Sequence, residues 1–264
     1  MKKPIGIIDS GVGGLTVAKE VMRQLPNETI YYVGDTARCP YGPRSSEEVA
    51  RFTWDMTEYL IQYDIKMLII ACNTATAVVL NEIKETLSIP VLGVILPGAR
   101  AALKHSHSGK IGVLGTVGTI RSNAYSKALK SINQDVKVSA LACPKFVPLV
   151  ESGEYEGDFA RRIVSKTLQQ MKADRLDTLI LGCTHYPLLE PIIQEVIGAE
   201  VKVISSGEET AREASTILDY NESLAVGDHT PHHRFFTTGS SKIFAQLASK
   251  WLQQDHLIVE TIDL

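Results

Sequence analysis

The sequence lacks any segment that would serve as a signal peptide or a membrane anchor. The apolar run that follows Met1 ends at Asp9, too early for the apolar region of a secretion signal, and no later run approaches the length of a membrane span. An excess of basic residues is also missing, because 27 Lys and Arg stand against 30 Asp and Glu, a net charge of -3. The sequence therefore predicts a cytoplasmic protein that binds neither membranes nor nucleic acid.

Cysteines are few, and none belongs to a C-x-x-C motif. The four residues, Cys39, Cys72, Cys143 and Cys183, stand singly along the chain, so in a cytoplasmic protein we expect them to be free thiols. A metal site would need all four to converge, which their wide spacing disfavours. We expect no metal.

A dinucleotide-binding fingerprint is also absent. Gly11 and Gly13 fit the first two glycines of G-x-G-x-x-G, but Thr16 stands at the third, and no acidic residue clearly follows the next apolar run in a ribose-binding position. We expect no cofactor. The backbone N–H groups of this turn, together with the Ser10 hydroxyl, suit a small anion such as a carboxylate.

Two long apolar runs indicate an α/β fold. The runs MLIIACNTAT (67–76) and TLILGCTHY (178–186) show no polar alternation, as in strands that are covered on both faces of a parallel sheet. Each run breaks at a small residue followed by cysteine. Because ligands bind at the carboxyl ends of such strands, we expect Cys72 and Cys183 at strand tips that face a crevice.

Similar motifs occur twice in the same order. IGIIDSG (5–11) resembles IGVLGTVG (111–118), and ARCP (37–40) resembles LACP (141–144). Roughly 110 residues separate the two apolar runs with cysteine, which is about the size of a domain. A duplicated α/β half explains the pattern. The alternative is that all parallel α/β sheets share such strands and turns.

We predict an α/β fold of two similar, pseudo-symmetric lobes with mainly parallel sheets and an active site in the crevice between them. The elements after about residue 206 are too few to form a third core, so they are expected to pack back on the first lobe. The first lobe would then comprise residues 1–96 and 206–264, and the second residues 97–205.

Prolines and cap-type residues predict where elements begin and end. Asn73 and Thr74 are expected to cap the helix after the first cysteine, and Pro187 to lie in the first turn of the helix after the second. A fourth strand is expected to end at Pro97 and Gly98.

Other polar residues in turns are candidates for ligand binding. Tyr41 and Gly42, in a loop rich in proline, offer a ring and a backbone donor, although the loop is equally explained as a rigid connector. Thr116 and Thr119 occupy the turn of the second half and are candidate anion ligands.

Two carboxylates each allow two interpretations. Asp9, at the tip of a buried strand, either caps its own turn or is a charged group that works at the crevice. Glu151, which follows an apolar stretch, is either a solvated loop residue or an acid that reaches the crevice.

Two thiols at facing strand tips suit proton transfer at the two faces of one carbon. A free thiol has a pKa of about 8.5, and a nearby helix start is expected to lower it by about one unit or less, which leaves thiol and thiolate both accessible. One sulfur then removes a proton while the other delivers one. Asp9 and His185 would assist, one beside each cysteine. A two-lobed amino-acid binding protein is an alternative, but it leaves the paired thiols unexplained and would need the secretion signal that is missing.

Four motifs resemble those of the cofactor-independent aspartate/glutamate racemase superfamily, and they cover almost the whole chain: DSGVGGLTV, GDTARCPYGPRS, ACNTATAV and LGCTHYPLL. The resemblance implies that L-glutamate and D-glutamate are interconverted by the two-thiol route, that D-glutamate is supplied for peptidoglycan, and that the protein is a homodimer. CNTA, rather than CNT followed by Met-His, resembles glutamate-specific more than aspartate-specific members, and aspartate remains the alternative substrate. The first strand begins near Met1, so we also expect no dependence on a cell-wall precursor as activator.

The same resemblance implies roles for individual residues. Cys72 and Cys183 would be the proton donor and acceptor pair, with Asp9 and His185 as assisting groups and Glu151 as a third. Substrate contacts would fall to Asp9, Ser10, Tyr41, Gly42, Asn73, Thr74, Thr116, Thr119, Thr184 and His185.

Overall fold

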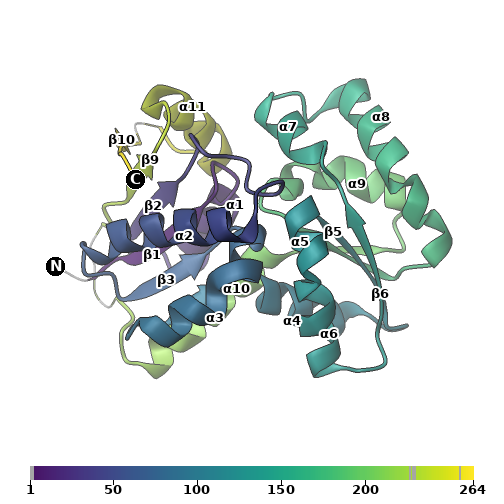
Figure 1. Cartoon of the computed structure of the whole chain (residues 1–264), viewed down its shortest axis with the longest axis horizontal. Helices are drawn as coiled ribbons and strands as arrows, with labels where there is room; N and C mark the ends of the chain where they lie inside the picture. Colours follow the sequence, from purple (N-terminus) through teal and green to yellow (C-terminus); the bar gives the residue numbers. More distant parts are fainter. Residues whose placement is uncertain (1–2, 226, 228–229, 256) are drawn as a thin grey trace.

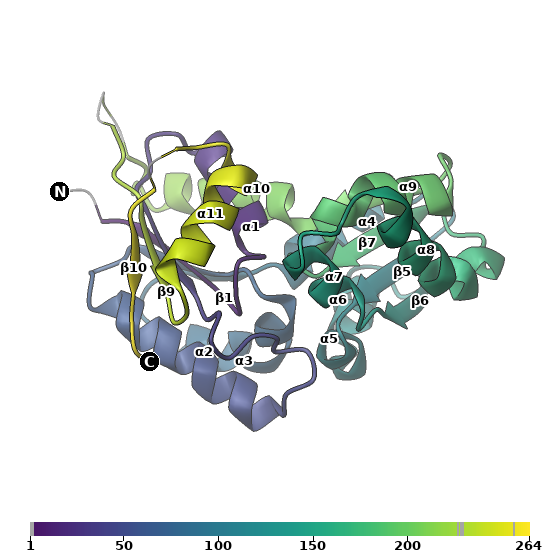
Figure 2. The same cartoon turned by 90° about the horizontal axis from the view of Figure 1, so that it is seen from above.

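The computed structural model shows two α/β lobes side by side, each built on its own parallel sheet (Figures 1 and 2). It describes residues 3–225, 227, 230–255 and 257–264. The chain begins and ends in the same lobe. Within the described ranges, no helix has both the length and the apolarity needed to cross a bilayer.

The first lobe contains a six-stranded sheet of order β10-β9-β2-β1-β3-β4 in which all neighbours are parallel. The central strands are buried along their whole length, which explains their unbroken apolar sequence. β9 pairs with β2, so strands from the last part of the chain extend the sheet that the first strands form. The strands are β1 (Ile5–Asp9), β2 (Ile30–Gly34), β3 (Met67–Ile70), β4 (Val91–Gly93), β9 (Arg234–Thr237) and β10 (Val259–Thr261).

The second lobe contains a four-stranded parallel sheet of order β6-β5-β7-β8. This order repeats β2-β1-β3-β4, and the cysteine-bearing runs provide the equivalent strands β3 and β7. The predicted fold of two similar α/β lobes is therefore confirmed. The strands are β5 (Lys110–Gly115), β6 (Lys137–Ala142), β7 (Thr178–Gly182) and β8 (Lys202–Ser205).

Helices cover both faces of each sheet, and α4 and α10 pack against each other where the lobes meet (Figure 1). One continuous apolar core runs from the α1 face of the first sheet into the second lobe, so the lobes share buried surface. The α-helices are α1 (Leu15–Gln24), α2 (Ser46–Ile61), α3 (Asn73–Thr86), α4 (Ile95–His105), α5 (Val117–Ser122), α6 (Ala124–Ile132), α7 (Phe146–Glu151), α8 (Gly157–Leu168), α9 (Glu190–Ile197), α10 (Ser206–Tyr220) and α11 (Ser241–Leu252), and the 3-10 helices are η1 (Gln169–Asp174) and η2 (Tyr186–Leu189).

The region after β4 differs from the prediction. Pro97 and Gly98 do not end the strand, because α4 already begins at Ile95 and contains both residues. Proline is tolerated there because N–H groups in the first turn have no acceptor within the helix. Gly98 allows α10 to come close, since a Cβ at this position would lie 3.1 Å from the Cβ of Ser206.

Candidate active site

Cys72 lies just beyond β3 and caps α3 with its own sulfur. Its backbone is extended, and its Sγ accepts a hydrogen bond from the Ala75 N–H at 3.5 Å. Asn73 and Thr74 were expected as the caps, but they are the first two residues of the helix. The thiol therefore sits directly on the positive end of α3.

Cys183 occupies the equivalent position beyond β7. The backbone N–H of His185 donates to its sulfur, and the Nδ1 atom of His185 lies 3.9 Å from that sulfur. Pro187 lies in the 3-10 helix η2 rather than in the first turn of an α-helix, and α9 begins only at Glu190. The second thiol thus has an imidazole neighbour in addition to its backbone donor.

Both thiols line one small cavity, of about 20 Å³, between the lobes. Most of the predicted site residues line it too. They are Ser10, Tyr41, Gly42, Cys72, Asn73, Thr74, Thr116, Cys183, Thr184 and His185. The ring of Tyr41 packs against Phe52, and its hydroxyl donates to Asp35, so the polar atom of this side chain is already engaged.

The two lobes are held together directly beside this cavity. The hydroxyl of Thr74 in the first lobe lies 2.9 Å from that of Thr116 and 3.2 Å from that of Thr119, both in the second lobe. The backbone N–H of Gly118 donates to the carbonyl of Gly42 at 2.9 Å. Thr119 therefore contributes to lobe contact without lining the cavity. We call these five residues the clasp.

Asp9 is the last residue of β1 and is fully buried. Its carboxylate accepts from the Gly11 N–H at 3.1 Å and from the Thr184 hydroxyl at 3.3 Å. It therefore stabilises its own turn and also reaches the second lobe. Burial raises the pKa of Asp9, and the charge of His185 and the hydrogen bonds counteract this only in part.

His185, Glu151 and Cys39 form a hydrogen-bonded group at the edge of the site. The Oε1 atom of Glu151 lies 3.1 Å from His185 Nε2 and accepts from the Cys39 thiol at 3.3 Å. Glu151, expected on a loop, is the last residue of α7, and its side chain is 35% exposed. Burial on its own raises the pKa of Glu151, but the hydrogen bond and charge of His185 outweigh it and leave the pKa lowered.

This group fixes the proton positions on the imidazole. An ionised carboxylate can only accept, so Nε2 of His185 donates to Glu151. In the neutral ring Nδ1 is then an acceptor, and it faces the thiol of Cys183. The arrangement gives Cys183 a base to which its proton can move.

Both thiols are harder to ionise than expected. Burial raises the pKa of Cys72 to about 11, and the charge of Asp9 adds to this, while donors from Ala75 and Ser10 lower it. Burial likewise raises the pKa of Cys183 well above its usual value. The expectation that a helix start would lower both values is therefore wrong, because loss of hydration outweighs the backbone donors.

Comparison with known proteins identifies the family. The model of the Asp/Glu/Hydantoin racemase family matches residues 5–214. The chain belongs to this family. A glutamate racemase of Listeria monocytogenes serotype 4b is 59% identical over 264 residues, which is 100% of this chain and 99% of the relative.

Solved structures of racemases have the same fold. The crystal structure of a glutamate racemase isoform from Bacillus anthracis is 52% identical and has a TM-score of 0.96, covering 99% of this chain and 98% of that chain. Glutamate racemase from Francisella tularensis in complex with D-glutamate is 33% identical with a TM-score of 0.93, again covering 99% and 98%. The whole chain is therefore similar to racemases in fold as well as in sequence.

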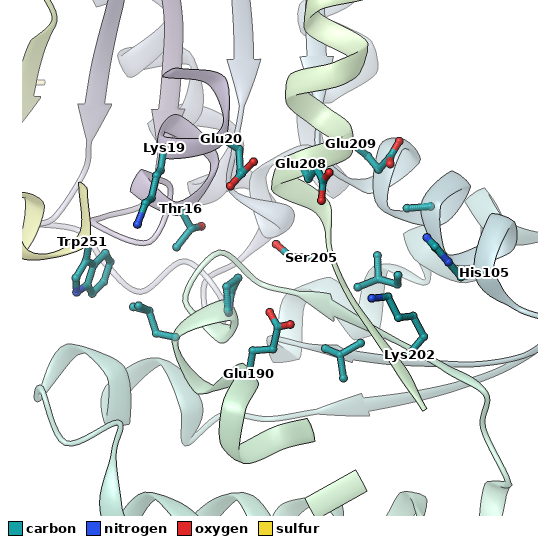
Figure 3. Close-up of a pocket in the computed structure, with 15 residues that line it drawn as sticks. Thr16, Lys19, Glu20, His105, Glu190, Lys202, Ser205, Glu208, Glu209 and Trp251 are labelled. Atoms are coloured by element: carbon teal, nitrogen blue, oxygen red, sulfur yellow. The ribbon is translucent and has the colours of Figure 1, made fainter. Parts of the chain in front are cut away.

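A second, wider hollow lies elsewhere in this racemase-family chain. It has a volume of about 640 Å³ and lies where α1, α10 and α11 of the first lobe face α4, β8 and the start of α9. Figure 3 shows its charged lining, including Lys19, Glu208, Glu190 and Lys202. No thiol lines it among the described residues.

Three lining residues were absent from the predicted site: Cys39, Pro40 and Val147. Cys39 and Pro40 lie within the motif GDTARCPYGPRS, so this motif was the available signal. Val147 lies in an apolar stretch with no feature that distinguishes it from core residues. Conversely, Asp9 and Glu151 act on lining residues without lining the cavity themselves. Among the described residues, no three ligand-type side chains are grouped so as to hold a metal ion.

Proposed function

We propose that the protein interconverts L-glutamate and D-glutamate by two-thiol proton transfer at the α-carbon, without a cofactor, and thereby supplies D-glutamate for peptidoglycan in the cytoplasm. The observation that carries the proposal is that Cys72 and Cys183, from equivalent strands of two similar lobes, line one cavity. Family membership and relatives named glutamate racemase support the substrate. By resemblance we propose a homodimer.

Each direction of the reaction breaks one C–H bond and forms another on the opposite face. From L-glutamate, the thiolate of Cys183 takes the α-proton and becomes a thiol, while the thiol of Cys72 gives its proton to the other face and becomes a thiolate. The reverse reaction exchanges the two roles. His185 takes up the proton that leaves Cys183 before reaction, and Glu151 keeps its imidazole in the accepting tautomer.

The Cys72 side uses different groups. Its thiolate, once formed, is stabilised by the N–H of Ala75 and the hydroxyl of Ser10. Asp9 opposes this thiolate through its charge, which favours return of a proton to Cys72. Hydroxyls of Thr74, Thr116 and Thr184, with the amide of Asn73, are suited to the two carboxylates of the substrate.

Substrate entry requires the lobes to separate. A cavity of about 20 Å³ holds about one water molecule, far less than glutamate. We propose that the moving bodies are residues 1–96 with 206–264, and residues 97–205. The boundary at 96/97 falls in the first turn of α4. Opening would change the clasp, the α4–α10 contact and the other hydrogen bonds between the two bodies, such as those from Thr184 to Asp9 and from Cys39 to Glu151.

The activity test uses purified protein that has been dialysed against chelator. We expect L-glutamate to become racemic and its α-hydrogen to exchange in heavy water without added pyridoxal phosphate, nucleotide or metal. Aspartate, assayed in parallel, tests the alternative substrate. Binding of glutamate without turnover would instead support a binding protein, and activity that returns only with a cofactor would contradict the proposal.

Growth of a D-glutamate auxotroph carrying the gene tests the peptidoglycan role.

A further inference from the structure

We infer that Tyr125 is a positioning residue for this reaction, acting through the carboxamide of Asn73, an inference that rests on the proposed function. Tyr125 is the second residue of α6 in the second lobe and is only 3% exposed. It is not among the described residues that line the cavity, so it acts on the substrate through a neighbour.

Tyr125 contacts the neighbours of both cysteines. Its hydroxyl lies 2.7 Å from the Oδ1 atom of Asn73, the residue that follows Cys72, and donates to it. Its ring packs against Gly182, the residue that precedes Cys183. A Cβ at position 182 would lie 2.8 Å from Cε2 of the ring, so only glycine permits this contact. One side chain of α6 thus links the two strand tips.

The carboxamide of Asn73 is half satisfied. Asn73 lines the cavity and is 2% exposed. Its oxygen is engaged by Tyr125, while its buried Nδ2 has no hydrogen-bond partner among the described residues. A buried donor without a partner is costly, which is expected where a ligand completes the bond. Because Tyr125 holds the oxygen, the NH₂ group remains for a substrate carboxylate.

The phenol also lies at the joint between the lobes. A Cβ at Gly98 of α4 would lie 3.3 Å from the Tyr125 hydroxyl and 3.1 Å from Cβ of Ser206, the first residue of α10. α4 and α10 are the helices that pack against each other where the lobes meet. The orientation of the Asn73 amide is therefore tied to the closed arrangement of the lobes.

The test removes only the phenol oxygen. Tyr125→Phe retains the ring against Gly182 but frees the Asn73 amide to rotate, so we expect the KM for both enantiomers of glutamate to rise about tenfold, with a smaller change in kcat. In an Asn73→Ala background the same substitution should have no further effect. Tyr59→Phe is the matched control, since it also removes a hydrogen-bonded phenol oxygen. Tyr59 lies on α2, and its hydroxyl is 3.0 Å from that of Tyr63, which follows the end of this helix. This control should keep the KM unchanged.

Three results would overturn the inference. They are a KM for Tyr125→Phe within twofold of the unsubstituted protein, an equal effect in the Asn73→Ala background, or a lowered melting temperature with unchanged KM. Glutamate binding by calorimetry provides a second readout, in which Tyr125→Phe should bind about tenfold more weakly. If the unsubstituted protein binds glutamate without turnover, the proposed racemisation fails while the calorimetric comparison still tests Tyr125.

Discussion

Burial determines the resting state of the reactive residues. A thiol with a pKa of about 11, as for Cys72, is ionised to about one part in ten thousand at pH 7. Burial raises the pKa of Cys183 as well. Both sulfurs therefore rest as thiols, and a thiolate forms only where a neighbour accepts the proton. The contact with Nδ1 of His185 provides such a neighbour for Cys183.

The raised pKa of Cys72 predicts a specific dependence on pH. A group that is harder to ionise in the folded state stabilises the fold below its unfolded pKa of about 8.5, and that contribution is lost as the pH rises from about 8.5 to about 11. In a pH titration, the absorbance near 240 nm of the unsubstituted protein minus that of Cys72→Ser reports the Cys72 thiolate. This difference should therefore appear close to pH 11. The stability advantage of the unsubstituted protein should fall by about 1.4 kcal/mol per pH unit in this window. A thiolate signal between pH 7 and 9 would contradict the expectation.

At the scale of elements, the first turn of α5 and the loop around Gly42 close the site. Gly118 is the second residue of α5, and a Cβ there would lie 2.9 Å from the Gly42 carbonyl oxygen and 3.0 Å from Cγ2 of Thr74. Glycine is required here for close approach between lobes rather than for turn geometry.

Gly118→Ala should therefore impair closure without unfolding the protein. Alanine favours the helix, but its methyl group pushes α5 away from Gly42, so we expect kcat/KM to fall about tenfold or more, while the melting temperature changes little. Gly207→Ala is a matched control, because its Cβ would meet its nearest atom at an ordinary 3.5 Å. Equal kinetics for the two variants would show that the clasp is not needed for turnover.

Elements differ in how far the sequence predicts them. β1 and β3 were predictable because strands that are buried on both faces have unbroken apolar sequence. The start of α4 was not predictable, because a proline such as Pro97 is common both after strands and in the first turn of helices. The helix here is supported by its tertiary contact with α10. The raised thiol pKa values were also not predictable, since they depend on burial by segments far away in sequence.

At the scale of the whole molecule, repetition explains the site. The order β2-β1-β3-β4 recurs as β6-β5-β7-β8, and Cys72 and Cys183 follow the equivalent strands β3 and β7. Two lobes of similar strand order that face each other bring two sulfurs to one cavity, as the proposed two-thiol racemisation requires. The copies are not identical, because Cys183 has an imidazole beside it, whereas the groups around Cys72 are a helix start, Ser10 and Asp9.

The most direct test of the two-thiol mechanism separates the two sulfurs. Cys72→Ser and Cys183→Ser should both lose racemisation, yet each should still abstract a proton from one enantiomer. A glutamate analogue with a leaving group on the β-carbon reveals abstraction alone, because elimination needs no second proton transfer. By resemblance to the racemase family, Cys72→Ser should process only the L-analogue and Cys183→Ser only the D-analogue, while Cys39→Ser should remain far more active in racemisation than either. If both variants eliminated from the same enantiomer, or if Cys39→Ser were as damaging as either, the assignment of Cys72 and Cys183 as the two bases would be wrong.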